Sequence, residues 1–474
     1  MAKLPSVSEN FSEWYIEILK LADLADYGPV KGTMIIKPYG YSLWKSIQDN
    51  LGRMINESGV EDMYFPLFIP YSFLAAEKDH VEGFAPEVAI VTKAGGEDLE
   101  EPLVVRPTSE TIMYKTFSQW IQSYRDLPLK INQWCNIVRW EKRTLPFMRT
   151  SEFLWQEGHT VHATQDEAIE EVMDALNRYD EFARTYMAIP SFKGRKTMGE
   201  RFAGGDFTTS LEILLKSKKA LQFCTSHMLG QNFAKVFDVT YVNESNEKEY
   251  AWQTSWGFST RTIGGLIGVH GDDKGLVLPP LMAPIQVVII PIYKDHEVGL
   301  KLKHHIDGLE KNLKAHGVRF KTDWSDNSLG WKSNNWEVKG VPVRIEIGEK
   351  ELANKEYSVV WRHSFTKQTV AEVKIMDFVL ESMKTIQAEM YQAAEKFMKE
   401  QTVIVNSEKE FVDAVNADVG FIKLFFKDDT KRAKELQAKY KVTPRNIPLD
   451  TEDERGPDIF TGEEGQLTVF AKAY

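Results

Sequence analysis

Apolar positions near the start of the chain recur at helical spacing. Residues 13–24 place three apolar side chains on one face of a helix, and residues 41–58 form a second amphipathic helix that ends at Gly59. The next segment, 61–69, predicts a strand. The opening of the chain therefore predicts two helices followed by a first strand.

A second group of elements predicts part of a sheet. Segments 130–140 and 153–160 read as strands, and the polar segment 141–150 between them reads as a hairpin loop. Residues 165–185 predict a helix. Two strands joined by such a loop predict an antiparallel pair.

The pattern changes after the break at Leu278-Pro279-Pro280. Apolar residues alternate strictly over 341–347, which is the period of a strand. Strands are expected at 286–293, 318–324, 341–347 and 357–361, and helices at 296–316 and 376–399. This strand–helix–strand spacing predicts a compact α/β domain of about a hundred residues.

A third, more acidic segment follows Gln401 and runs to Tyr474, with a loop expected over 450–464. A chain of 474 residues predicts two to four domains at about 100–200 residues each. We expect three, with α+β and α/β folds: residues 1–283, 284–400 and 401–474.

Composition is typical of a globular protein, with 43% hydrophobic and 27% charged residues. The net charge of −11 argues against a protein that coats nucleic acid non-specifically. A local basic patch over 130–150 nevertheless holds five cations against the single acid Glu141. From charge alone, a solvated loop and an anion contact explain this patch equally well.

No apolar run approaches the about 18–20 residues of a membrane helix, and no secretory signal is visible. Cys135 and Cys224 are the only cysteines, so neither a disulfide framework nor a four-cysteine zinc site is expected. The cytoplasm is the expected compartment, with no membrane partner.

Several common catalytic signatures are missing from the sequence: the phosphate-binding P-loop, the G-x-G-x-x-G turn, the G-x-S-x-G elbow and the H-E-x-x-H zinc motif. If the chain uses ATP, it holds the nucleotide in another way. His159 and His162 lie three residues apart and so point to opposite faces of a strand, which favours a hydrogen-bonding role over a metal site.

Charged residues stand instead within apolar strand sequence. Arg106 and Glu110 flank a Pro-Thr turn, and Arg139 and Glu141 are expected on one face of a strand. Trp155, Glu157 and His159 share a face in the same way. Burying such a face is costly unless its charges are paired or used.

Two interpretations of this face remain open from the residues alone. One is a buried ion-pair network. The other is a pocket for a small zwitterion and a phosphate, since Arg binds phosphate through paired hydrogen bonds, Glu suits an ammonium or an adenine amino group, and Phe stacks on a base.

The spacing Arg139-x-Glu141, a variable loop, then Arg149-x-x-x-Phe153 resembles motif 2 of the class II aminoacyl-tRNA synthetases. G-V-E-D-M-Y-F-P (59–66) resembles their motif 1, which forms a dimer interface. Six further stretches resemble the prolyl-tRNA synthetase family in its archaeal and eukaryotic-like form: R-P-T-S-E-T (106–111), N-Q-W-C-N-I-V-R-W-E (132–141), F-L-W-Q-E-G-H (153–159), F-A-G-G-D (202–206), T-S-H-M-L-G-Q-N-F (225–233) and G-L-V-L-P-P (275–280).

This resemblance covers most of residues 10–380 and implies a class II antiparallel-sheet catalytic domain, an α/β anticodon-binding domain and a small α+β C-terminal domain. It implies ATP- and Mg²⁺-dependent activation of L-proline to prolyl-adenylate, followed by transfer to the 3′ end of tRNA(Pro) in a homodimer. The residues that it assigns to catalysis and ATP binding are Arg139, Glu141, Arg149, Phe153, Gln222, Thr225 and Arg261.

Within that set, Arg139 would hold the α-phosphate and the proline carboxylate, Glu141 would read adenine and Phe153 would stack on it. Arg149 and Arg261 would bind the outer phosphates. The resemblance further implies a proline site at Thr108, Glu110, Arg139, Trp155, Glu157, His159, Phe202, His227 and Ser255, with Phe84 in a closing loop.

The second domain carries W-E-V-K-G-V-P-V-R (336–344), which resembles the family's anticodon-binding domain. Glu337 and Arg344 would read the two guanines of a proline anticodon, with Lys367 as a further candidate. An exposed strand cation is the plain alternative for Arg344.

The sequence departs from the family in several places. The C-terminal segment has no cysteine, so its usual zinc site is not expected, although the chain still ends in Tyr474, whose carboxylate would fold back towards the active site. Phe223 and Cys224 replace small residues and would narrow the site; Cys224 is either a reactive thiol or a plain buried one. Arg261 substitutes for the usual motif 3 arginine.

The segment before Thr225 is too short for an inserted editing domain. Since a proline pocket cannot strongly exclude the smaller alanine, we expect alanine activation without hydrolysis of alanyl-tRNA. A threonine or glycine synthetase is one alternative; the aromatic pocket of Trp155 and Phe202 and the absence of zinc-ligand cysteines argue against threonine. A catalytically silent tRNA-binding relative is the other, disfavoured by the intact motif 2 residues.

Overall fold

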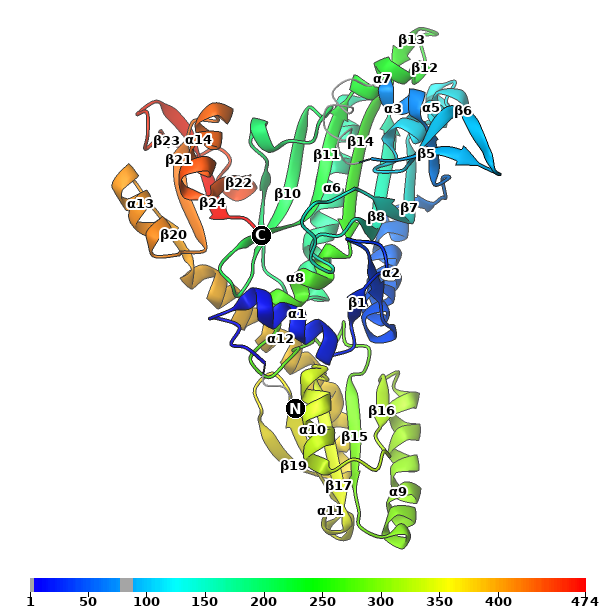
Figure 1. Cartoon of the computed structure of the whole chain (residues 1–474), viewed down its shortest axis with the longest axis vertical. Coiled ribbons are helices and arrows are strands. Elements are labelled where there is room, and N and C mark those ends of the chain that lie inside the picture. Colours follow the sequence, from blue (N-terminus) through cyan, green and yellow to red (C-terminus); the bar gives the residue numbers. More distant parts are fainter. Residues whose placement is uncertain (1–3, 77–87) are drawn as a thin grey trace.

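A computed structural model of the chain describes residues 4–76 and 88–474. Its longest sheet occupies the upper half of the molecule, a smaller α/β unit hangs below it, and the C-terminal segment flanks the sheet on one side (Figure 1). The long helix α12 (Ile375–Glu400) runs from the lower unit back to the C-terminal segment.

The main sheet is built around an antiparallel set of long strands. The described strands follow the spatial order β20-β21-β24-β22-β9-β10-β11-β14-β8-β7-β3. Their bounds are β20 Thr402–Ile404, β21 Phe421–Phe426, β24 Glu464–Lys472, β22 Val442–Pro448, β9 Phe192–Arg195, β10 Phe207–Leu214, β11 Ala220–Gly230, β14 Trp252–Ser259, β8 Glu152–His162, β7 Leu129–Val138 and β3 Glu61–Asp62.

Four helices bury the apolar side of this sheet. α6 (Gln165–Thr185) begins where Thr164 and Glu167 form a capping box, and it packs against β11, β14 and β10. The others are α1 Phe11–Leu21, α2 Pro38–Glu57 and the buried helix α8 Arg261–His270. Their apolar faces meet in one core with the fully buried Trp14, Trp44 and Trp256.

Several predicted elements are confirmed, and two need correction. The helix at 165–185 has the predicted ends, and the loop at 141–150 joins β7 to β8. The predicted strand 61–69 is instead two short strands in different sheets, β3 and β4 (Phe68–Pro70), because Pro66 between them has no N–H to donate. β7 ends at Val138, so Arg139 and Glu141 lie in the loop and not on a strand face.

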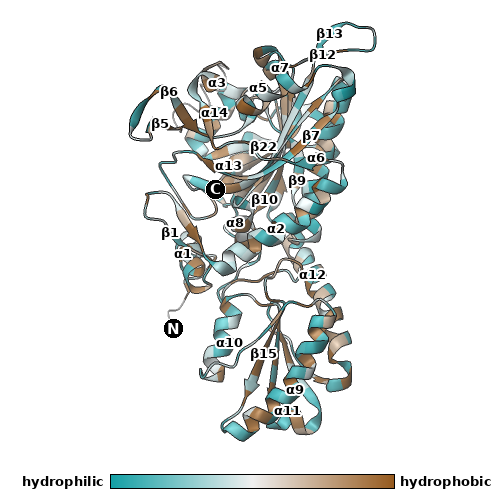
Figure 2. Cartoon of the chain, turned by 90° about the vertical axis from the view of Figure 1, so that its right-hand side faces the viewer, coloured by the Kyte–Doolittle hydropathy of each residue, from teal (hydrophilic) through white to brown (hydrophobic). Residues whose placement is uncertain are grey.

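The lower unit is a five-stranded sheet in the order β16-β15-β17-β18-β19. Its strands are β16 Phe320–Thr322, β15 Val287–Ile292, β17 Val343–Gly348, β18 Glu356–Trp361 and β19 Lys367–Ala371. Apolar strands stand between hydrophilic helix surfaces in Figure 2, as expected of a covered sheet. The helices are α9 His296–Ala315, α10 Leu329–Val338, α11 Glu349–Asn354 and α12.

The remaining elements are short. Small sheets pair β1 (Ala25–Tyr27) with β2 (Met34–Ile36), β12 (Thr240–Val242) with β13 (Lys248–Tyr250), and β6 (Glu97–Val105) with both β4 and β5 (Ala89–Ala94). The predicted loop at 450–464 contains β23 (Arg455–Pro457), which pairs with β24. Further helices are α3 Tyr71–Ala75, α5 Glu110–Trp120, α7 Asn232–Phe237, α13 Glu408–Asn416 and α14 Thr430–Tyr440. None of the helices in the described ranges is long and apolar enough to span a membrane.

The C-terminal segment is continuous with the main sheet, which the sequence did not predict. β22 pairs antiparallel with β9, and a buried ion cluster lies at this junction. Glu212 on β10 is fully buried and accepts from Lys196 at 2.7 Å and from two nitrogens of Arg445 on β22 at 2.9 and 2.8 Å. Burial raises the pKa of Glu212, but the charges of Arg445 and Lys196 outweigh it and hold the pKa below its usual value.

Glu212→Gln should destabilise the fold by about 3 kcal/mol, because it leaves two buried cations without their counter-charge. The matched control is Glu452→Gln, which breaks the partly exposed Arg195–Glu452 pair at the same junction and should cost less than about 1 kcal/mol. Urea unfolding of both variants at neutral pH measures the difference. Equal losses would show that the buried cluster does not hold this junction.

Candidate active site

One row of side chains crosses four neighbouring strands of the main sheet. The register aligns Thr208 on β10 with His227 on β11, His227 with Ser255 on β14, and Ser255 with His159 on β8. Because cross-strand partners share a face, the register alone brings these four residues together.

A second row lies two residues further along the strands. It joins Thr225, Gly257, Glu157 and Gln133 on β11, β14, β8 and β7. On the opposite face, a Cβ at Gly158 would lie 2.2 Å from the ring of Trp256, so only glycine fits there. All residues of the two rows except Gln133 line a cavity of about 250 Å³ and form its floor.

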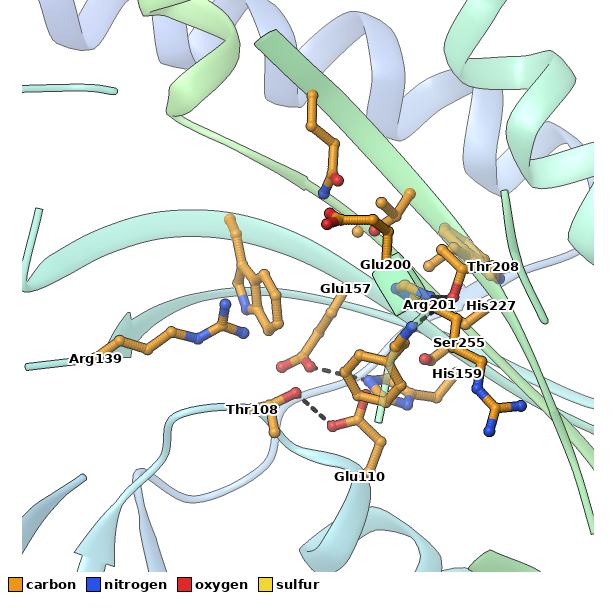
Figure 3. A pocket seen from close by; sticks show the side chains of 16 residues that line it. Thr108, Glu110, Arg139, Glu157, His159, Glu200, Arg201, Thr208, His227 and Ser255 are labelled. Atoms are coloured by element: carbon orange, nitrogen blue, oxygen red, sulfur yellow. Dashed lines mark hydrogen bonds and ion pairs between the residues drawn. The ribbon is translucent and has the colours of Figure 1, made fainter. Parts of the chain in front are cut away.

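A buried ion pair stands on this floor. Glu157 Oε2 contacts His159 Nε2 at 2.9 Å, and Glu157 Oε1 accepts from Ser109 at 2.6 Å and Gln133 at 2.8 Å. Burial opposes both charges, but the pair overrides it: the pKa of Glu157 is lowered and the pKa of His159 is raised. The negative charge of Glu157 is therefore balanced within the protein, as the dashed contacts in Figure 3 show.

Glu110 is the second buried carboxylate of the cavity. It is the first residue of α5, where the helix dipole favours a negative charge, and its carboxylate accepts from the Thr108 hydroxyl. Arg106 holds the preceding turn by donating to the carbonyls of Phe65 at 2.7 Å and Asn136 at 2.8 Å. Thr108 and Glu110 thus face the same space as Glu157 (Figure 3).

Arg139 reaches the cavity from the loop after β7. Its Nε donates to the carbonyl of Pro107 at 2.9 Å, and its guanidinium lies 5.6 Å from the ring centre of Phe153 and 5.5 Å from that of Trp155. Two aromatic rings therefore fix the direction of this cation. Figure 3 shows it on the opposite side of the cavity from His227 and Ser255.

The wall behind Ser255 is neutral. Burial lowers the pKa of His227 to about 4, so the imidazole carries no charge at neutral pH. The Thr208 hydroxyl accepts from the backbone N–H of Phe202 and lies 2.9 Å from His227 Nδ1. The Phe202 ring packs on His227 at 4.6 Å, and the buried Ser255 Oγ has no hydrogen-bond partner among the residues that the structure describes.

A second cavity of about 520 Å³ adjoins the first and is cationic. Arg149, Arg261 and Arg445 line it together with Tyr474, whose backbone N–H is anchored on the carbonyl of Ala220 at 3.0 Å. Burial, followed by the charges of Arg139, Arg149 and Arg445, lowers the pKa of Arg261 to about 10, against the opposing charge of Glu141. An anion bound here would relieve that repulsion.

Gln222 lines both cavities. A bulge in β11 places Phe223 opposite no residue of β10, so Gln222 and Thr225 reach the same face although they lie three residues apart. Phe223 instead packs on Phe258 in the core, and burial raises the pKa of the Cys224 thiol. The expected narrowing of the site by these two residues is wrong, and Cys224 is a plain buried cysteine.

The structure brings the predicted proline-site residues together and adds others. All nine line the first cavity, with Gln222 and Thr225 beside them. Glu141 pairs with Arg149 at 3.0 Å at the edge of the second cavity, and Phe84 lies outside the described residues. Five residues that line the first cavity were not predicted from the sequence: Glu200, Arg201, Thr208, Trp256 and Gly257. The stretch 202–206 marked their neighbourhood, but only strand register identifies Thr208.

The three predicted anticodon residues also meet, in the lower unit. Arg344 on β17 donates to Glu337 on α10 at 2.8 Å and to Glu346 at 2.9 Å. Lys367 on β19 lies 3.5 Å from the other oxygen of Glu346. Arg344 is thus a paired, largely buried cation rather than an exposed strand residue.

Replacing Glu157 by Gln should lower the pKa of His159 below its free value of 6.5, because burial then acts without the compensating carboxylate. In the wild-type protein, this pair contributes its full stability between about pH 4.5 and 6.5: above the free Glu pKa and below the free His pKa. NMR titration of ¹³C-labelled histidines measures the shift, with His270, whose pKa is lowered by burial to about 4, as the internal control. A His159 pKa that stays above 6.5 in the variant would contradict this electrostatic account.

Comparison with protein families matches two segments of the chain. Residues 91–270 match the class II core domain of tRNA synthetases (G, H, P, S and T), and residues 286–382 match an anticodon-binding domain. The first match contains both rows of the cavity floor. The second contains Glu337, Arg344 and Lys367.

Full-length relatives point to one amino acid. The chain is 47% identical to the proline–tRNA ligase of Amoebophilus asiaticus over 100% of this chain and 99% of the relative. It is also 47% identical to that of Symbiobacterium thermophilum over 98% and 97%. The crystal structure of prolyl-tRNA synthetase from Cryptosporidium parvum, complexed with halofuginone and AMPPNP, superposes with a TM-score of 0.95 at 39% identity, covering 100% of this chain and 99% of that one. The chain belongs to the prolyl-tRNA synthetase family of class II aminoacyl-tRNA synthetases.

Proposed function

We propose that the two adjoining cavities are the proline and ATP sites of a proline–tRNA ligase, which activates L-proline to prolyl-adenylate and transfers it to the 3′ end of tRNA(Pro). The observation that carries this assignment is their junction at Gln222. There, a pocket with buried carboxylates meets a cavity lined by arginines. A zwitterionic amino acid and a polyphosphate placed in them have their reacting groups side by side.

Proline fits the first cavity in one orientation. Glu110 faces this cavity, with Thr108 beside it, and is the carboxylate that would complement the imino NH₂⁺ group. Trp155, Phe202 and the neutral His227 offer apolar faces to the pyrrolidine ring, and the Ser255 hydroxyl lies at the same wall. The proline carboxylate then points towards Arg139.

ATP fits the second cavity with its phosphates near the arginines. Arg139 would hold the α-phosphate, and Arg149 and Arg261 the β- and γ-phosphates. Phe153 would stack on adenine, Glu141 would accept from its amino group, and Gln222 and Thr225 would contact the nucleotide. Mg²⁺ would bind to the phosphate oxygens of ATP and neutralise part of their charge. Such a site needs only one or two carboxylates from the protein.

The protein's contribution to the chemistry is positioning and charge stabilisation. The proline carboxylate attacks the α-phosphorus in line with the departing pyrophosphate, so negative charge builds up between the reactants. Arg139 is held by Pro107 and two aromatic rings before any substrate arrives, which avoids reorganisation during the reaction. In the second step, the ribose hydroxyl of tRNA attacks the activated carbonyl.

The lower unit would recognise the anticodon of tRNA(Pro). Arg344 and Glu337 would exchange their mutual ion pair for contacts with the two guanines, and Lys367 would add a cation at the same edge. On this assignment, residues 1–283 form the catalytic domain, 284–400 the anticodon-binding domain and 401–474 the C-terminal domain.

The proposed function extends to the oligomeric state of the chain and to its cellular compartment. The chain would form a homodimer through residues 59–66, in the cytoplasm, where a protein with two free cysteines needs no disulfide. The C-terminal domain would need no structural zinc, since its sequence has no cysteine and the Glu212 cluster joins it to the main sheet.

Arg139→Ala should lower proline-dependent ATP–pyrophosphate exchange by at least about 10²–10³-fold, because it removes a preorganised donor to the reacting phosphate. Arg125→Ala is the control, since Arg125 is an exposed arginine outside both cavities. Exchange within about twofold of wild type, in a folded Arg139→Ala protein, would contradict the assignment of motif 2.

Glu110→Gln should raise the KM for proline about 10- to 100-fold, because a neutral amide no longer balances the imino cation. The KM for ATP, measured in the same exchange assay, is the internal control and should stay within about twofold. An unchanged KM for proline would exclude Glu110 from the imino site.

A further inference from the structure

Helix α8 connects the ATP cavity to the boundary with the lower unit. It begins at Arg261, which lines that cavity, and runs to His270 with every residue from Thr262 onward buried. Lys216 fixes its far end by donating to the carbonyls of His270 at 3.1 Å and Gly271 at 2.6 Å. A short helix packed on all sides moves as one body, so its two ends are mechanically linked.

An ion pair crosses the boundary just beyond this helix. Arg362, which follows β18 and is 3% exposed, donates to both carboxylate oxygens of Asp272 at 2.8 and 2.6 Å. Burial raises the pKa of Asp272, but Arg362 outweighs it and holds the pKa below its usual value. The pair is therefore charged and bidentate, which is the most directional form of ion pair.

Arg362 also reaches the proposed anticodon site. Its third donor, Nε, bonds to the backbone carbonyl of Glu337 at 2.8 Å, and the carboxylate of Glu337 pairs with Arg344. Arg362, Glu337 and Arg344 line the same small hollow, together with Phe365. One guanidinium thus touches the anticodon side with one nitrogen and the end of α8 with two.

The backbones around this pair are in close contact. Leu276 N–H donates to the carbonyl of Val338 at 3.0 Å, and a Cβ at Gly275 would lie 2.5 Å from the Cα of Val338. Val338 is the last residue of α10, which carries Glu337. Because these backbones touch, a shift of α10 on the anticodon side is expected to move residues 272–276 as well.

We propose that Asp272 and Arg362 are positioning residues that couple anticodon binding to the placement of Arg261 at the ATP cavity. When Arg344 turns from Glu337 to a base, the end of α10 is released, and the bond from Arg362 passes that change to Asp272 and so to α8. This inference rests on the anticodon role proposed above for Glu337 and Arg344. It adds a function for a residue pair that touches neither substrate.

The alternative is that the Asp272–Arg362 pair has a purely structural role and only holds the lower unit against the main sheet. If the role is purely structural, removing the pair would lower the stability of the protein and would affect every reaction to the same extent. A coupling device changes only the reaction that includes the anticodon, and coupling of this kind typically changes a rate or affinity by about 5–150-fold.

Asp272→Asn and Arg362→Lys are the test variants. The asparagine keeps Oδ1, which also accepts from the N–H groups of Lys274 and Gly275, so the local turn is preserved. Three rates are compared: ATP–pyrophosphate exchange without tRNA, aminoacylation of full-length tRNA(Pro), and aminoacylation of an acceptor-stem minihelix that lacks the anticodon. We expect kcat for full-length tRNA to fall about tenfold, with its KM, the exchange rate and the minihelix rate within about twofold of wild type.

Asp23→Asn is the matched control, because Asp23 forms another ion pair across the same boundary, with Lys339 at 3.1 Å, but is exposed. It should leave all three rates unchanged. Unchanged kcat for full-length tRNA in both test variants, or an equal fall in all three reactions, would overturn the coupling.

Arg344→Ala separates failure of this inference from failure of the anticodon assignment. It should raise the KM for full-length tRNA, and Asp272→Asn should have no further effect on kcat in that background. If Arg344→Ala has no effect, the anticodon role and the coupling both fail. If Arg344→Ala acts and Asp272→Asn does not, only the coupling fails.

Discussion

The hydrogen-bond register of β10, β11, β14, β8 and β7 is the constraint on which the site depends. It aligns Thr208, His227, Ser255 and His159 in one row and Thr225, Gly257, Glu157 and Gln133 in the next. A slip of one residue in any strand would turn its members of these rows to the opposite face. The bulge at Phe223 lets Gln222 line both cavities.

Two cavities of different electrostatic character adjoin on this sheet and share Gln222. In the first cavity, Glu157 is neutralised by His159, and Glu110 is a second buried carboxylate. In the second cavity, Arg139, Arg149 and Arg445 repel Arg261, and the charge of Glu141 opposes this repulsion. On the assignment proposed above, an amino acid and a polyphosphate would each satisfy one of these environments. The C-terminal segment takes part in the second, because Arg445 is held there by Glu212, a residue of the main sheet.

Sequence patterns revealed the elements that carry a clear apolar signal, and missed buried strands that carry polar residues. The helix at 165–185 was predicted to the residue, since its apolar stripe and its Thr164–Glu167 capping box are local signals. The strands β9, β10 and β11 were not identified, because Thr208, Thr209 and Ser210 are polar yet buried and so show no alternation. The break in strand 61–69 followed from Pro66, a signal that was present but outweighed by the apolar pattern.

The candidate site shows the same division. Motif 2, the T-x-E turn at 108–110 and the strand around Glu157 can be read from local sequence, together with their resemblance to a known family. Ion pairs between residues that are far apart in the sequence cannot be predicted in this way. Arg445 and Glu212 are 233 residues apart, and Arg362 and Asp272 are 90 residues apart. Their burial is tolerated only because each charge finds its partner through the fold.

The most direct measurement for the central claim is amino-acid-dependent ATP–pyrophosphate exchange by the unmodified protein, with proline, alanine, threonine and glycine tested in parallel. The account predicts strong exchange with proline and weak exchange with alanine, which fits the same pocket but fills it less. It predicts none with threonine or glycine above background. Exchange that is strongest with threonine or glycine, or absent with proline in a folded protein that still binds tRNA, would contradict the assignment of the cavity.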